Sequence, residues 1–99
     1  MSYRLQYTRE FYEDFERYYG NLAEIDLQLA ERVFDAMQKA MKVLEDFPFA
    51  GRRAVSENAF ARELLVPFGS SGYILLYEVE DSETVTILAV RHQREDDYH

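Results

Sequence analysis

The chain has 99 residues, of which 11 are basic and 19 acidic, with no Cys and no Trp. A chain of this size buries roughly 60 to 70% of its surface on folding, so we expect one domain over residues 1–99 with a single core. The lack of Cys excludes disulfides and thiol nucleophiles, and neither a membrane span nor a signal peptide is visible, which together predict a soluble cytoplasmic protein.

The first predicted elements are a strand followed by a helix. Residues 3–8 alternate in polarity, and one face is formed by Tyr3, Leu5 and Tyr7. Thr8 is then placed to cap a helix. Aromatic side chains recur along that helix at helical spacing, namely Phe11, Phe15 and Tyr18 or Tyr19. The acidic residues between them are expected to face water, namely Glu10, Glu13, Asp14 and Glu16. Gly20 is expected to end the helix as a left-handed C-cap.

A second, longer helix is predicted next. Asn21 followed by Glu24 resembles a capping box at its start. Apolar residues then step by three and four, namely Leu22, Ile25, Leu29, Val33, Met37, Ala40 and Leu44. The Phe47-Pro48 dipeptide should stop the helix, because a residue before proline avoids helical dihedrals. Two helices joined by so short a connection fold back as an antiparallel hairpin.

Three strands are predicted in the second half of the chain. They cover residues 62–66, 73–80 and 84–91, and short turns rich in Gly, Ser and Asp separate them, which is typical of an antiparallel meander. The last run is apolar on both faces in its second half, so it should be a central strand. The polar tail 91–99 is expected to leave the sheet. The element order predicts an α+β fold, with a helical hairpin packed on a small antiparallel sheet in the order β-α-α-β-β-β.

No strong catalytic motif is present. The sequence contains no P-loop, GxGxxG, HExxH or GxSxG pattern. His92 and His99 have no third residue of metal-ligand type close by, so we expect no metal site. No cofactor is expected either. The carboxylates along the two helices have the spacing of a solvent face, which argues against an acid/base pair.

Arginine residues are the most informative candidates for a binding site. In the strand half of the chain they fall into three places: Arg52 and Arg53, then Arg62, then Arg91 and Arg94. If they converge, they form a guanidinium cluster suited to carboxylates or phosphates. The alternative is that each arginine pairs with a local acid such as Glu57, Glu63 or Asp96. The formal charge of -8 repels polyanions, so a protein partner is favoured over nucleic acid.

Four stretches of the chain resemble the RelE/ParE superfamily of bacterial toxins from type II toxin-antitoxin systems. They are the Pro48-x-x-Gly51-Arg52 loop, the Arg62-Glu63-Leu64 strand start, the hairpin GSSGYILLYEVED and the ending VTILAVRHQREDDY. The resemblance implies the fold order derived above. It also implies one of two activities: RelE-like members cleave messenger RNA on the ribosome, whereas ParE-like members inhibit DNA gyrase by binding it.

The cationic set of the RNA-cleaving branch is incomplete here. Ile74 stands where RelE-like chains have an arginine after the hairpin tyrosine, and Leu64, Leu65, Val66 and Pro67 stand where basic residues are expected. Arg94 and Tyr98 match the arginine and tyrosine of the tail. Loss of one transition-state contact costs about 10²-fold or more in rate. The resemblance is therefore nearer to the ParE-like branch.

Three hypotheses follow from the resemblance. The first is a ParE-like toxin, of the plasmid-stabilisation kind, that inhibits a protein target, DNA gyrase above all, and is neutralised by a cognate antitoxin folding across the groove between hairpin and sheet. The second is a RelE-like endoribonuclease acting through Arg62, Arg94 and Tyr98. The third is a non-toxic binding module. Neither direct nucleic-acid binding nor membrane binding is expected. The residues expected to bind target or antitoxin are Arg52, Arg53, Arg62, Arg91, His92, Arg94 and Tyr98.

Overall fold

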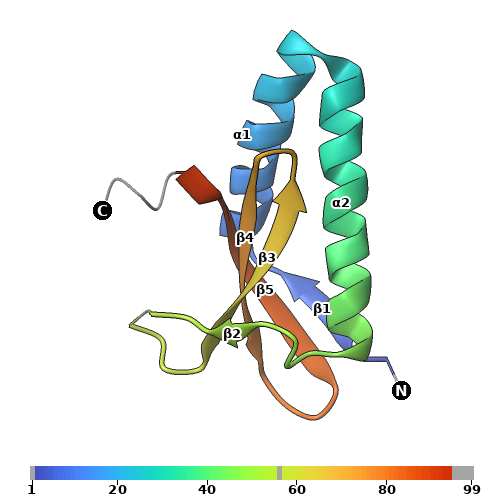
Figure 1. The fold of residues 1–99 in the computed structure, drawn as a ribbon. Helices are drawn as coiled ribbons and strands as arrows, with labels where there is room; N and C mark the ends of the chain where they lie inside the picture. The colour runs from blue at the N-terminus through green and yellow to red at the C-terminus, as the bar shows by residue number, and fades with distance from the viewer. Residues whose placement is uncertain (1, 56, 95–99) are drawn as a thin grey trace.

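Two helices and five strands make up the part of the fold that the structure describes. The computed structural model describes residues 2–55 and 57–94. Its elements are, in order, β1 (Arg4–Tyr7), α1 (Arg9–Ile25), α2 (Leu27–Asp46), β2 (Arg52–Arg53), β3 (Ala61–Phe68), β4 (Ser71–Val79) and β5 (Thr84–His92). Figure 1 shows the helices side by side on one face of the sheet, while the other face is open. The predicted α+β fold, a helical hairpin on a small sheet, is confirmed.

The sheet has the strand order β1-β5-β4-β3-β2. Strands β3, β4 and β5 form the predicted antiparallel meander, and β5 is an interior strand as expected. Two details differ from the expectation. The sheet is mixed, because β1 pairs with β5 in parallel, and a fifth strand, β2, pairs with the start of β3. Strand direction depends on how the helical hairpin carries the chain across the sheet, which no local pattern encodes.

The boundary between the helices differs from the prediction. Helix α1 continues through Gly20 to Ile25, and Asn21 and Glu24 lie inside it, so the expected C-cap and capping box are both wrong. Asp26 separates the helices, and its carboxylate accepts the N–H groups of Gln28 and Leu29 at 3.0 and 3.4 Å. Among the described residues only Gly69 has a positive φ. A helical glycine costs about 1 kcal/mol relative to alanine, which the packing of the apolar stripe on either side outweighs.

The remaining helix ends follow the prediction. The Thr8 hydroxyl accepts the N–H of Phe11 at 3.1 Å and caps α1. Helix α2 ends at Asp46, directly before Phe47-Pro48. No helix among residues 2–55 and 57–94 has the length and apolar character needed to cross a membrane.

The core lies between the helical hairpin and the sheet. Its largest fully buried side chains are Tyr77, Leu44, Leu75, Ile87, Val33, Val85 and Val90. The register between β4 and β5 shifts after Leu76, which leaves Leu88 as an extra residue on β5. A bulge of this kind bends the strand. It lets Ile87 and Val90, three residues apart, both enter the core.

Candidate functional site

The predicted arginines fall into two groups. Arg52 and Arg53 form β2 and stand opposite Glu63 and Arg62 on β3. Arg91 and His92 end β5 on the far side of β4, with Arg94 just beyond them. The register places Arg52 and Arg91 three strand spacings apart across the sheet and two residues apart along it, which is about 16 Å at the usual strand dimensions. The structure thus brings Arg52, Arg53 and Arg62 together and leaves the second group at a distance.

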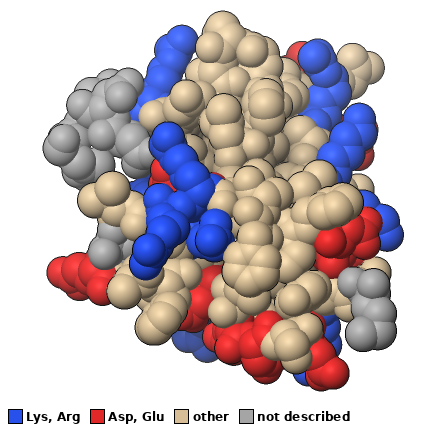
Figure 2. Space-filling view, turned by 60° about the horizontal axis from the view of Figure 1, so that its bottom comes forward, with Lys and Arg blue, Asp and Glu red and all other residues tan. Residues whose placement is uncertain are grey.

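The arginines also divide between the two faces of the sheet. Arg62 stands opposite the core residue Tyr77, so Arg62 and its cross-strand neighbour Arg53 lie on the helix side. Arg52 lies on the open side with Glu63, and Arg91 lies on that side opposite Ile74. Figure 2, in which the bottom of Figure 1 is turned toward the viewer, shows a gathering of Lys and Arg side chains left of the centre, beside a wide uncharged area, with acidic side chains along the lower margin.

A shallow hollow of about 460 Å³ lies over the open face. Leu65 and Ile74 line it, with Arg52 and Gln93 among its other residues. The Arg52 Nε lies 2.6 Å from the Glu63 carboxylate, so the charge of this arginine is already compensated. For Arg52 the predicted alternative, pairing with a local acid, is therefore confirmed.

Arg62 holds a loop against the core. Its Nη1 donates to the Gly51 carbonyl at 2.6 Å, and its guanidinium lies 5.0 Å from the centre of the Phe49 ring. The Gly51 N–H donates to the hydroxyl of Tyr77 at 2.9 Å. Burial raises the pKa of Tyr77, while the Gly51 hydrogen bond and the Arg62 charge act in the opposite direction. Arg62 thus holds the loop that precedes β2 through one guanidinium nitrogen, Nη1.

His92 is fixed by four neighbours. Its ring meets Tyr73 edge-on at 5.2 Å, and its Nε2 lies 3.4 Å from the Ser71 hydroxyl. Its Nδ1 accepts the Arg94 N–H at 3.1 Å, so in the neutral ring the proton is on Nε2. Its own N–H donates to the Tyr18 hydroxyl at 3.0 Å. Burial raises the pKa of Tyr73.

Two further expectations concern metal binding and the residues of the tail. Within residues 2–55 and 57–94 no group of three His, Cys, Asp or Glu could hold a metal ion. Tyr98, His99 and Asp96 lie outside the described residues.

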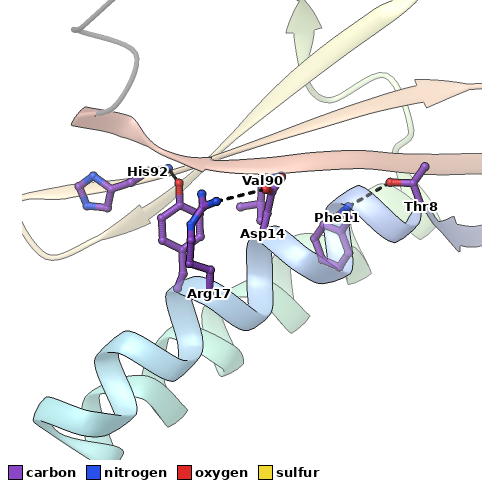
Figure 3. A network of polar contacts seen from close by, with 7 residues as sticks. Thr8, Phe11, Asp14, Arg17, Val90 and His92 are labelled. Carbon is purple, nitrogen blue, oxygen red and sulfur yellow. Dashed lines mark hydrogen bonds and ion pairs between the residues drawn. The ribbon is translucent and has the colours of Figure 1, made fainter.

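The outer edge of β5 is covered by side chains of α1, which the sequence reasoning missed. Strand β1 ends at Tyr7, and beyond it the Thr8 hydroxyl donates to the Leu88 carbonyl at 2.7 Å. Asp14 accepts the Val90 N–H at 3.3 Å, and Tyr18 accepts that of His92. Figure 3 shows Asp14 pointing from α1 toward Val90 on the strand. The prediction that Asp14 lies on the solvent face is therefore wrong, because only 17% of its side chain is exposed.

A groove separates α2 from the free part of β3. Its volume is about 550 Å³. Apolar side chains form its walls, namely Ala36, Ala40, Val43, Val66 and Phe68. Three charged side chains form its rim, namely Arg32, Asp35 and Lys39. Strand β2 pairs only with Arg62 and Glu63. Among the described residues, β3 from residue 64 to 68 therefore has no strand partner on this side.

Comparisons with known proteins agree with this architecture. The family described as "ParE toxin of type II toxin-antitoxin system, parDE" matches residues 5–97. A comparison with curated protein sequences finds no match. A solved structure described as the chromosomal ParDE TA system from P. aeruginosa superposes with a TM-score of 0.72 at 17% identity, covering 92% of this chain and 96% of that one. The resemblance drawn from the sequence is confirmed.

Proposed function

Because this chain belongs to the ParE toxin family of type II toxin-antitoxin systems, we propose that it is a toxin that inhibits a protein target in the bacterial cytoplasm. DNA gyrase is the target we propose. The action is binding, with no bond made or broken by the toxin, and a cognate antitoxin keeps it silent.

The make-up of the open sheet face supports this function best. Leu65 and Ile74 are among the residues that line the hollow there, and Arg52 is paired with Glu63 at 2.6 Å. Cleavage of RNA needs cations aimed at the charge that develops in the transition state. An apolar floor beside a compensated charge instead suits a protein surface.

A supercoiling assay tests the gyrase proposal. We expect micromolar toxin to inhibit gyrase or to trap cleaved DNA, and the antitoxin added first should abolish the effect. Relaxation by topoisomerase I, run in parallel, is the control for general interference. Unaffected supercoiling would remove gyrase as the target, and cleaved transcripts in a translating extract would replace binding with a nuclease function.

We further propose that the antitoxin occupies the groove between α2 and β3. An extended segment can add a strand to β3 at residues 64–68, and the groove supplies apolar walls for its alternate side chains. Arg32 and Lys39 on the rim offer positive charge to an acidic segment. A disordered tail that folds on binding can cover such a long surface.

Filling the groove tests where the antitoxin binds. Ala36 lines the groove, whereas Gln38, two residues later, is exposed and does not line it. We expect Ala36→Trp to weaken binding of the antitoxin encoded beside this chain by about tenfold or more, which is about 1.4 kcal/mol. The control Gln38→Trp should leave the affinity unchanged. Equal affinities in calorimetry would place the antitoxin elsewhere.

A further inference from the structure

Within residues 2–55 and 57–94, two arginines have no carboxylate partner although acidic residues are abundant. Arg53 and Arg62 stand directly opposite each other on β2 and β3. Like charges in that position repel. Arg53 donates to the Ala59 carbonyl at 3.3 Å and Arg62 to the Gly51 carbonyl at 2.6 Å, both neutral acceptors. Neither forms an ion pair with the described residues, whereas Arg52, next to them, is paired with Glu63.

Two exposed phenylalanines lie beside this pair. Phe49 and Phe60 are 61% and 75% exposed, and both come from the segments that flank β2. Phe49, Phe60, Arg53 and Arg62 line one hollow of about 240 Å³. We call these four residues the end patch. Concentrated exposure of large apolar side chains marks an interaction surface, and arginine and aromatic residues dominate the binding energy of interfaces.

The charges indicate what the end patch accepts. Two adjacent guanidinium groups provide forks for a carboxylate or a phosphate. A nucleic acid would bring a long run of phosphates to a protein whose formal charge is -8, which is unfavourable. A protein segment with one or two carboxylates avoids this repulsion. The phenylalanines favour an apolar side chain beside the acid.

We infer that the end patch binds an acidic segment of the toxin's protein target. A carboxylate of that segment lies on the Arg53–Arg62 pair, and a neighbouring aromatic or large aliphatic side chain enters the hollow between Phe49 and Phe60. The partner's identity as the target rests on the proposed toxin function, while its chemistry rests on the patch alone. The patch lies at the start of β3 and the groove at its far end, so target and antitoxin contact different parts of the strand.

A peptide titration tests the chemistry without using toxicity. The probe is acetyl-Asp-Phe-Asp-amide, the control is acetyl-Asn-Phe-Asn-amide, and the readout is the amide NMR spectrum of the full chain. We expect the acidic peptide to shift the signals of Arg53, Arg62 and Phe60 in a saturable way. The neutral peptide should bind about tenfold more weakly, as expected for loss of a charged hydrogen bond.

Variants and a competitor sharpen the titration. Arg53→Gln should weaken binding of the acidic peptide by a similar factor. Arg9 is an exposed arginine of α1, and Arg9→Gln should leave this binding unchanged. Unchanged spectra elsewhere establish that the variants fold. Equal binding of both peptides, or shifts confined to other surfaces, would overturn the inference. An eight-nucleotide oligothymidylate that binds the patch more tightly would overturn it in favour of nucleic acid.

Growth assays connect the end patch with the target. We expect Arg53→Gln and Phe60→Ala to reduce growth arrest by about tenfold while antitoxin affinity stays unchanged. Reduced antitoxin affinity with intact toxicity would overturn the assignment to the target. If the unaltered chain does not arrest growth, the toxin function fails, yet the peptide titration still reports on the patch.

Discussion

The Tyr77 hydroxyl accepts a hydrogen bond from the Gly51 N–H at 2.9 Å, which joins the centre of the sheet to the loop before β2. Tyr77 is fully buried, and Gly51 is buried as well. The bond satisfies a donor and a hydroxyl that burial would otherwise leave unpaired. It also fixes where β2 begins, and with it the position of Arg53 beside Arg62.

Gly51→Ala is expected to destabilise the protein. A Cβ at this position would overlap the carbonyl oxygen of Glu63 and lie 2.7 Å from the hydroxyl of Tyr77. Overpacking of this kind costs about 1–3 kcal/mol or more in the free energy of unfolding. Urea denaturation followed by circular dichroism measures the loss. An unchanged midpoint would mean that the loop does not approach β3 this closely.

Gly20→Ala is expected to have the opposite effect. Nothing lies within 4 Å of a Cβ added to Gly20, which is part of α1. Replacing a helical glycine by alanine stabilises by about 0.5–1 kcal/mol. The same denaturation assay should therefore show a higher midpoint. A lower midpoint would indicate that α1 ends at Gly20 after all.

Tyr77→Phe is expected to change how the free energy of unfolding depends on pH in the alkaline range. Burial raises the pKa of Tyr77, so the folded state holds the phenolic proton more firmly than the unfolded chain does. The resulting stability is complete below about pH 10, the ordinary tyrosine value, and is lost as the pH rises toward the folded-state pKa. The variant should lose about 1–3 kcal/mol at neutral pH from the unpaired Gly51 N–H.

Above about pH 10 the Tyr77→Phe variant should lose stability less steeply than the unaltered protein. Urea midpoints between neutral and alkaline pH measure both effects. Tyr12→Phe, at an exposed position of α1, is the matched control. Parallel curves for Tyr77→Phe and the unaltered protein would contradict the proposed role of burial.

Asp14→Ala is expected to loosen α1 from β5. Without the carboxylate, the Val90 N–H loses its acceptor at 3.3 Å. A buried donor left without a partner costs about 1–3 kcal/mol. Amide hydrogen exchange at Val90 should accelerate, whereas Asp14→Asn retains an acceptor oxygen and should lose less. Glu13→Ala, at the exposed neighbouring position, is the control and should change stability by about 0.5 kcal/mol or less.

Arg52 and Arg62 should differ in their contribution to stability. The Arg52 side chain is 80% exposed, so its pair with Glu63 is screened by water and is worth about 0–1 kcal/mol. Arg62→Gln removes the bond to Gly51 and the contact with Phe49, and it should cost about 1–3 kcal/mol. Thermal unfolding of Arg52→Gln and Arg62→Gln compares them directly. A larger loss for Arg52→Gln would contradict this ranking.

Local patterns in the sequence predicted most elements of the fold. The Thr8 cap, the stop at Phe47-Pro48 and the alternation along β4 each depend on residues a few positions apart, where sterics and hydrogen bonding act within one element. The order of these elements was enough to predict a helical hairpin on a sheet. The same reasoning placed helix ends at Gly20 and Asn21, because it could not include the packing that carries α1 to Ile25.

What the sequence by itself determined is the two helices, the four longer strands, the apolar stripe of each and the family. The tertiary structure alone decided that β1 lies parallel to β5, that Asp14 faces a strand edge, and that Arg52 and Arg53 point to opposite faces of the sheet. These features depend on pairing between residues far apart in the chain. A shift of one residue in the strand register would move each of these side chains to the opposite face of the sheet. The assembled sheet therefore decides which arginine pairs with an acid.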